Sequence, residues 1–409
     1  MNAIDEVLKS PVDLPGATEP ISDKKLVLGD GSLTTAKIIL GWLVDAIKQT
    51  LELPERRQQR ILKLLTSILT RKRVTLRQWQ KLLGELRFVS PGVSGSRGLF
   101  CILQVPLMRK SKGRIRITRH IQRILTTFKQ LVEDLASRPT RLAEIIPDSP
   151  RVVGDMDACG YRLGGVFFSQ GHDPKVWRDP LPEYLVKQLV STSNPEGDVT
   201  NSDFEQAANI MQHDNIAHTF DIREVTIANL TDNTPTLTRH FKGSTTTEGP
   251  ASYLCQISRL HQRFHRYCAE VSFINGEANV MADDASRLQH LTDAELLNHF
   301  NSHYPQERAW TICRSRPDML SSVISALQRR GNFKRMLRPP RDTLPLPGDA
   351  GSTSVKSTTS KQICLGAQVP LLPSKSSLSE SGSGATIKAA RTPSELMPYL
   401  STSLPSTRR

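Results

Sequence analysis

The sequence has few cysteines and no long apolar run, and both absences exclude classes of protein. Its six cysteines are scattered without a Cys-x-x-Cys pair, which argues against a zinc module or a disulfide framework and favours reduced thiols. No apolar stretch approaches the roughly 18 residues that a membrane span needs, and the first residues lack the apolar core of a signal peptide. We therefore expect a soluble intracellular protein with no membrane contact, in the nucleus or the cytoplasm.

Acidic residues are almost absent from one part of the chain. Residues 56–129 contain 19 lysines and arginines against a single acidic residue, Glu85, whereas residues 151–290 contain 12 basic and 18 acidic residues. The whole chain of 409 residues has a net charge of +14 and a pI of about 9.7. A basic module followed by a mildly acidic one predicts an acidic partner, most commonly nucleic acid.

Apolar periodicity divides the chain into regions of different character. An apolar run at 36–47 predicts a strand bent at Gly41, with 50–54 as its returning partner, and helical spacing follows from Pro54 to about residue 137. Residues 151–290 alternate strands with helices, which predicts an α/β domain with a mixed sheet and flanking helices. The expected organisation is an irregular segment (1–35), a basic and mainly helical module (36–145), the α/β domain (146–290), a short helical extension (291–335) and a disordered tail rich in Ser, Thr and Pro (336–409).

Four carboxylates occupy the ends of predicted strands or the starts of predicted helices. Asp157 and Asp232 end apolar strands, while Glu205 and Asp283 lie near helix starts, and such places can meet at one edge of a sheet. Like charges that meet there raise one another's pKa values unless a cation neutralises them. Oxygen ligands suit Mg²⁺ or Mn²⁺, and two such ions can activate water and stabilise the leaving oxygen of a phosphodiester.

Each of these positions also has an ordinary structural explanation. A single aspartate at a strand end or helix cap is structural in most cases, and Ser-Asp-Phe-Glu alone is a capping pattern. Asp155, two residues before Asp157 on the same face of the strand, is interpreted either as a supporting group or as a residue beyond the sheet. The order and the contexts of the four carboxylates together favour the metal site.

Four motifs occur in an order that resembles the RNase H domain of retrotransposon polyproteins. They are "DMDACGYRLGGVFF" (155–168), "TNSDFEQAA" (200–208), "LTDNTPTLTRHFKGS" (230–244) and "INGEANVMADDASR" (274–287). The last is the most specific, because it matches Gly-x-x-Asn-x-x-Ala-Asp-x-x-Ser-Arg. The resemblance implies an RNase H-like sheet, two Mg²⁺ or Mn²⁺ ions, and Asp157, Glu205, Asp232 and Asp283 as the catalytic and metal-binding residues.

The upstream region resembles another part of the same polyproteins. "IILGWLVDAIKQTLELPERRQQRILKLL" (38–65) is similar to the end of a reverse transcriptase palm entering its thumb, and "WQKLLGELRFVSPGVSGSRGLF" (79–100) to the helical connection that follows. The helical module is therefore expected to be thumb/connection-like. The Tyr-x-Asp-Asp turn of a polymerase is missing from residues 1–40, so this chain is not a complete reverse transcriptase, and a separate chain could supply a polymerase.

The chain departs from the family pattern at a few positions. Cys159 replaces the common Ser, Asn275 replaces a usual Pro, and Arg239-His240 stand where an apolar or aromatic pair is common. No histidine stands ahead of Asp283 where cellular RNases H have one. His261 and His265 lie further back on a predicted helix, and we interpret them as structural or solvent-facing.

The basic region suggests where nucleic acid would bind. Phosphate contacts of this kind position a duplex without reading its sequence, and an RNA–DNA hybrid would be held by groove shape and 2′-hydroxyls. Trp79 and Trp177 are expected in cores. The candidate nucleic-acid-binding residues are Arg71, Lys72, Arg73, Arg109, Lys110, Lys112, Arg114, Arg116 and Arg119.

Two functions remain open at this point. The first is an endoribonuclease of RNase H type that hydrolyses the RNA strand of RNA–DNA hybrids by two-metal-ion catalysis. The second is a catalytically inactive retroelement remnant that only binds nucleic acid. An integrase-type transferase fits less well, because its usual three carboxylates close with a different spacing from that of residues 279–287.

Overall fold

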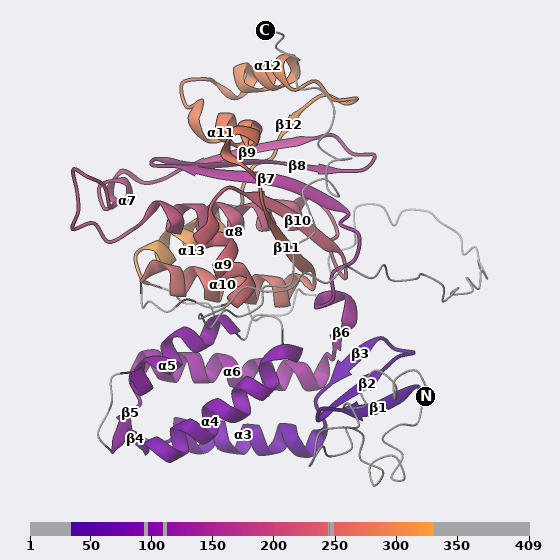
Figure 1. Ribbon diagram of the computed structural model, residues 1–409, viewed down its shortest axis with the longest axis vertical. Helices are drawn as coiled ribbons and strands as arrows, with labels where there is room; N and C mark the ends of the chain where they lie inside the picture. The colour runs from indigo at the N-terminus through magenta and orange to yellow at the C-terminus, as the bar shows by residue number, and fades with distance from the viewer. Residues whose placement is uncertain (1–33, 94–96, 109–112, 244, 246–248, 331–409) are drawn as a thin grey trace, which may run out of the picture.

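The computed structural model describes residues 34–93, 97–108, 113–243, 245 and 249–330. Figure 1 shows a mainly helical module and an α/β part stacked along the long axis, with helix α10 (Pro250–His265) between the module and the large sheet. The expected disordered tail, and nearly all of the expected irregular segment at the start, lie outside the described residues. The boundaries of the five expected segments stay predictions.

The helical module begins its helices where the sequence offers caps. Pro54 precedes the first helix, and Thr75 forms a capping box with Gln78 at the start of the second, which satisfies two backbone amides that the helix leaves unpaired. Trp79 is fully buried and its indole N–H donates to the Leu103 carbonyl at 3.1 Å. The module contains α3 (Glu55–Leu69), α4 (Leu76–Val89), α5 (Phe100–Met108) and α6 (Arg119–Ser137), with the short turns η1 (Ser90–Gly92), η2 (Arg97–Leu99) and η3 (Leu142–Glu144).

A small sheet completes this module, and it corrects one expectation. The run at 36–47 is a hairpin of two antiparallel strands rather than one bent strand, because Leu40 and Gly41 both have positive φ angles, of 49° and 82°. Two such residues make the tight turn whose twist matches paired strands. The sheet has the order β1 (Ala36–Ile39), β2 (Trp42–Asp45), β3 (Thr50–Glu52), β6 (Thr140–Arg141).

The large sheet has six strands and mixed directions. The three strands that come first along the chain, β7, β8 and β9, form an antiparallel meander. Strand β10 runs parallel to β7, and β11 runs parallel to β10. The carboxyl ends of β7 and β10 therefore meet at one edge. In spatial order the strands are β11 (Cys268–Phe273), β10 (Thr226–Thr231), β7 (Val152–Cys159), β8 (Arg162–Ser169), β9 (Lys175–Pro180) and β12 (Thr311–Ile312).

Helices cover both faces of this sheet, which confirms the expected α/β class with a mixed sheet and flanking helices. Phe204 and Met211 of α8 pack with Met156 and Phe167 under one face, and Trp177 is fully buried in the same core. Figure 1 shows α11 and α12 on the other face. The helices are α7 (Glu183–Val186), α8 (Asn201–Thr219), α9 (Thr234–Lys242), α10, α11 (Val280–Arg287), α12 (Asp293–His303) and α13 (Pro317–Leu327), with the short turn η4 (Gly276–Ala278).

Two further expectations can be compared with the described residues. The five cysteines among them, Cys101, Cys159, Cys255, Cys268 and Cys313, are all free, as expected for reduced thiols. Every helix in the described part of the chain is too short or too polar to cross a bilayer.

Candidate metal centre and nucleic-acid interface

Asp157 lies near the end of β7, where a helix comes unusually close to the sheet. Its strand partner is Gly164 of β8, and a Cβ atom at that glycine would lie 2.6 Å from the backbone nitrogen of Ser286 in α11. Only glycine therefore allows α11 to approach so closely. The approach lets the Ser286 hydroxyl donate to Asp157 Oδ2 at 2.6 Å.

Two other predicted ligands converge on Asp157 from different elements. Glu205 comes from the first turns of α8 and Asp232 directly follows β10. One carboxylate oxygen of each of the three residues lies within 4.8 Å of the others. Asp157 and Glu205 are buried, with 6% and 3% of their surface exposed, and Asp232 is half-buried. The structure thus brings together three of the four predicted carboxylates.

Asp283 lies beside this group rather than within it. It is close enough that its charge raises the pKa values of both Asp157 and Asp232. Its own carboxylate accepts a hydrogen bond from Arg287 Nε at 2.5 Å, four residues further along α11. The side chain of Asp283 is 40% exposed, so solvent reaches it.

The carboxylates in this group are destabilised as anions. Burial, followed by the charges of Asp157 and Asp232, raises the pKa of Glu205 to about 9. Burial also raises the pKa of Asp157, against the hydrogen bond from Ser286, and burial raises that of Asp232. Glu205 Oε2 is buried without a hydrogen-bond partner among the described residues. A divalent cation would neutralise this repulsion and give the buried oxygens a partner, so the residues fit divalent ions with oxygen ligands.

Sequence reasoning missed two residues that shape the site. Ser286 belongs to the most specific motif, but its hydroxyl bond to Asp157 depends on the close approach of α11. The other is Arg239 of α9, whose guanidinium donates to the Ser202 carbonyl at 2.9 Å and pairs with Asp203 at 3.1 Å. Arg239 therefore anchors the first turn of α8, which carries Glu205.

Asp155 lies within β7 rather than beyond the sheet. It pairs in register with Val166 of β8 and Leu230 of β10 and is 1% exposed. In the described part of the chain neither of its carboxylate oxygens has a hydrogen-bond partner, and burial raises its pKa to about 7. No described residue therefore bonds it to the group around Asp157.

A second acidic and histidine group occurs elsewhere, and an arginine already occupies it. Ligand atoms of Asp214, His261 and His265 also lie within 4.8 Å of one another. Both oxygens of Asp214 accept hydrogen bonds from Arg316, and His261 bonds to Asp214 and to Tyr267. Burial raises the pKa of Asp214, but the bonds from His261 and Arg316 outweigh it and hold that pKa below its usual value. A guanidinium thus provides the countercharge, and His261 is buried within this hydrogen-bonded network.

The predicted nucleic-acid-binding residues within the described parts gather on and around a two-stranded ribbon. Val74 and Ile115 point into the core of the module, each 2% exposed, while Arg73 lies directly opposite Arg116 on the outer face. Arg109, Lys110 and Lys112 lie outside the described residues. The ribbon consists of β4 (Arg73–Thr75) and β5 (Arg114–Arg116), and its cationic surface is formed by Arg71, Lys72, Arg73, Arg114, Arg116 and Arg119, all exposed.

The ribbon and the carboxylate group lie toward the same side of the molecule. The start of β8 aligns with the end of β7 at Cys159 and with the end of β9 at Pro180, and α7 follows β9. In Figure 1, α7 and the β4–β5 ribbon are both on the left of the view, one beside the large sheet and the other at the end of the helical module. The carboxyl end of β7 and the ribbon therefore both lie toward the left of this view.

Comparison with known proteins gives weak structural likenesses. No family model and no curated protein matches the chain. Foamy viral protease-reverse transcriptase in complex with an RNA/DNA hybrid has 12% identity and a TM-score of 0.27, over 60% of this chain and 30% of that one. The same viral protein with double-stranded DNA has 12% identity and a TM-score of 0.26, over 60% and 46%. A form designated dRH, also with double-stranded DNA, has 13% identity and a TM-score of 0.26, over 59% and 38%. The chain thus spans less than half the length of these proteins, and the likeness is too weak to assign a function.

Proposed function

We propose that this chain is an RNase H-like nuclease that binds RNA–DNA hybrids and hydrolyses the RNA strand with divalent metal ions. The observation that carries the proposal is the convergence of Asp157, Glu205 and Asp232 within 4.8 Å, where no cationic side chain of the described residues bonds to them in the way that Arg316 bonds to Asp214. Keeping three carboxylates together in a largely buried place is costly unless a cation binds there. The four sequence motifs favour this metal site over a purely structural role.

Asp157, Glu205 and Asp232 would hold the metal, with Asp283 beside them. Bound Mg²⁺ or Mn²⁺, two ions in the proposed mechanism, would supply activation of water and stabilisation of the leaving oxygen of the phosphodiester. The chain's own residues set the geometry. Ser286 orients Asp157, Arg239 fixes the start of α8, and Arg287 pairs with Asp283.

The cationic ribbon supports the nucleic-acid part of the proposal. Like charges directly opposite each other, as at Arg73 and Arg116, destabilise a strand pair. A phosphate bound between the two guanidinium groups would offset this repulsion. Contacts from arginine and lysine to phosphates position a duplex without reading bases. Such contacts suit a substrate recognised by its shape.

The direct test uses the full chain and a hybrid labelled on its RNA strand, with Mg²⁺ or Mn²⁺. We expect metal-dependent cleavage of the RNA strand that is lost in Asp157→Asn. The matched control is Glu277→Gln, an exposed acidic residue on the turn η4 next to the site, which should cleave like the unmodified chain. Binding of the hybrid without cleavage in either metal would reject the nuclease and leave the inactive, nucleic-acid-binding remnant.

A further inference from the structure

The helical module and the α/β part meet along α10. Leu254 and Ile257 of this helix lie in the core under the large sheet, and Tyr253 packs against the same core. Toward the module, Leu260 is fully buried and belongs to the module's own hydrophobic core. Tyr253 lies seven residues earlier and its ring centroid is 5.5 Å from that of His120 in α6. The two parts of the chain thus share a helix.

The backbone itself approaches α10 at this junction. A Cβ atom at Gly98, in η2, would lie 2.7 Å from the carbonyl oxygen of Cys255 and 3.0 Å from its carbonyl carbon. Such a distance means that η2 packs against α10 with no side chain between them. This close contact leaves little room for η2 to slide along α10.

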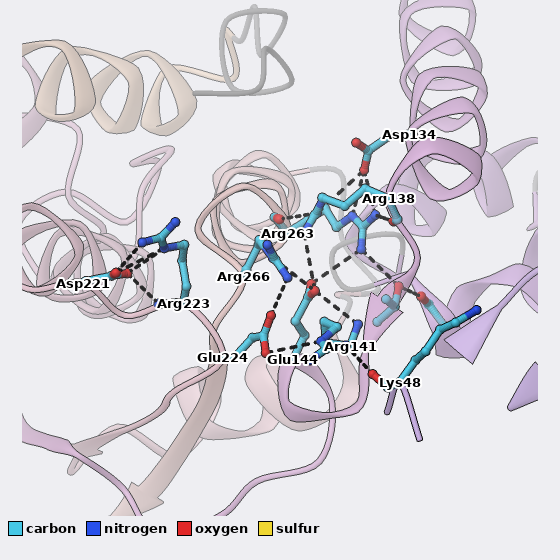
Figure 2. A network of polar contacts seen from close by, with 12 residues as sticks. Lys48, Asp134, Arg138, Arg141, Glu144, Asp221, Arg223, Glu224, Arg263 and Arg266 are labelled. Atoms are coloured by element: carbon cyan, nitrogen blue, oxygen red, sulfur yellow. Dashed lines mark hydrogen bonds and ion pairs between the residues drawn. The ribbon is translucent and has the colours of Figure 1, made fainter. Parts of the chain in front are cut away.

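Next to this apolar contact lies an ionic cluster that crosses the junction, with Arg263 and Glu144 buried at its centre and Asp134 partly exposed (Figure 2). Arg263, on α10, is 3% exposed and directs its guanidinium into the module. It donates to Asp134 from Nε at 2.9 Å and from a terminal nitrogen at 2.8 Å, to the Thr140 hydroxyl at 3.0 Å and to the Arg138 carbonyl at 2.8 Å. One side chain of the α/β part therefore ties down the end of α6 and strand β6.

Glu144 is the anionic centre of the same cluster. It is fully buried, and its oxygens lie 3.5 Å from Arg263, 3.4 Å from Arg138 and 3.5 Å from Arg266. Arg138 in turn donates to the Arg263 carbonyl at 2.9 Å. Removing Arg263 or Glu144 leaves the remaining buried charge with fewer partners, which destabilises the contact.

A second anion extends the cluster across the junction. Glu224, which precedes β10, pairs with Arg266 and lies 3.3 Å from Arg141 of the module. Glu224 and Arg266 are both non-glycine residues with positive φ angles, of 60° and 61°, and the Glu224 amide donates to the Arg266 carbonyl at 2.7 Å. Backbone held in this sparsely populated region persists where surrounding contacts fix it.

We propose that this junction is a positioning device: Arg263 and Glu144 hold the cationic ribbon and the carboxylate group at one separation, and that separation determines where a bound hybrid is cut. The inference rests on the proposed function. Arg263 and Glu144 are positioning residues, because neither lies among the carboxylates or on the ribbon. A duplex held by phosphates at the ribbon would reach the carboxylates at a fixed number of base pairs, so a loosened junction would spread the cuts.

The test compares Arg263→Met with Arg223→Met in the full chain. Arg223 also appears in Figure 2, but its guanidinium pairs with Asp221, two residues away on the same part of the chain. Two readouts are taken. One is the distance of the cuts from a recessed hybrid end, and the other is single-molecule energy transfer between dyes attached at positions 67 and 302, which are exposed serines of α3 and α12.

We expect the unmodified chain and Arg223→Met to give a narrow transfer distribution and cuts at one spacing. Arg263→Met should broaden the distribution and spread the cuts while total cleavage is retained. Should Arg263→Met fail to fold, Glu144→Gln, which keeps the side-chain volume, is expected to have the same two effects. A narrow distribution in a folded variant, or cuts that stay at one spacing despite a broadened distribution, would overturn the inference. Absence of cleavage by the unmodified chain would instead reject the proposed function, and the transfer distributions would still decide whether Arg263 holds the junction.

Discussion

Asp155 shows what an unpaired carboxyl group costs inside a sheet. It is almost fully buried, without a hydrogen-bond partner among the described residues, and burial raises its pKa from 3.8 to about 7. The folded state therefore holds a proton that the unfolded chain releases between these pH values, so stability falls as pH rises through this window. The expected loss is about 1.4 kcal/mol per pH unit while one proton differs between the two states.

Replacing Asp155 by Asn removes this titration and keeps the shape. Denaturant unfolding measured from pH 5 to 7 should show a smaller decrease in the free energy of unfolding for Asp155→Asn than for the unmodified chain. The decrease is not expected to vanish, because burial also raises the pKa values of Asp157, Glu205 and Asp232. Equal slopes for the two proteins would mean that Asp155 is already ionised or hydrated in the folded state.

Glu205 provides a metal test that does not depend on cleavage. A divalent ion that binds only the folded state raises the unfolding temperature by mass action. Because the pKa of Glu205 is raised to about 9, the ion must displace a proton, and its stabilising effect should be larger at pH 8 than at pH 6. Thermal unfolding with and without Mn²⁺ should show this shift in the unfolding temperature, and chelation with EDTA should reverse it. In Glu205→Gln the shift should be smaller at both pH values, and a shift equal to that of the unmodified chain would place the ion elsewhere.

The β4–β5 ribbon carries the prediction at the scale of an element. Replacing Arg73 and Arg116 by Gln should weaken hybrid binding and make its salt dependence shallower, by about one in the logarithmic slope for each phosphate that the ribbon no longer neutralises. The free energy of unfolding should stay the same or rise by about 0.2–1 kcal/mol, because two like charges opposite each other are removed. Binding titrations at several salt concentrations measure the first effect and denaturant unfolding the second.

The control for the ribbon removes the same charge from a distant surface. Arg308 and Arg314 are exposed and pair with Asp173 and Asp293 on the α/β part. Replacing both by Gln changes the net charge by the same amount but leaves the ribbon intact, so the salt slope of hybrid binding should not change. A slope that decreases equally in both double variants would show that the overall charge, rather than the ribbon, attracts the duplex.

At the scale of elements, local sequence patterns predict single helices and strands better than they predict how these elements pair and pack. The helical spacing that follows Pro54 predicts the helices of the module, α4 among them, and the strand carrying Asp157 follows from its apolar run and the turn after it. Strand β12 has only two residues and exists because it pairs with β9, so no periodicity could reveal it. The apolar run around Gly41 does not distinguish a hairpin from a bent strand, because two positive φ angles are a property of the turn and not of the run.

In the candidate site, too, the sequence indicates the residues but not the side-chain contacts between them. Motifs on separate elements indicate Asp157, Glu205 and Asp232, since strand ends and helix starts meet at a sheet edge. They do not indicate that Arg287 engages Asp283, although the spacing of four residues allows it. Contacts such as Arg263 with Glu144 span 119 residues, and only the packing of α10 against the module brings them together.

For the whole molecule, the shared helix α10 predicts how the two parts unfold. Leu260 and Leu254 are both fully buried on this helix, but Leu260 belongs to the core of the module and Leu254 to the core under the sheet. Truncating either leucine to Ala should cost about 2–5 kcal/mol. The loss at Leu260 falls on the contact between the two parts, whereas the loss at Leu254 falls within one of them.

Calorimetry should therefore distinguish Leu260→Ala from Leu254→Ala, although both replace a buried leucine of α10 by alanine. The unmodified chain is expected to unfold in one transition, because the buried ionic cluster and Leu260 couple the two cores. Leu260→Ala should separate the unfolding into two transitions, while Leu254→Ala should lower the temperature of a single one. The expected contrast follows from cooperativity, since two cores unfold together only while the contact between them is stable enough to make partial unfolding unfavourable. Two transitions in the unmodified chain would show that the junction is too weak to set the spacing between the ribbon and the carboxylates.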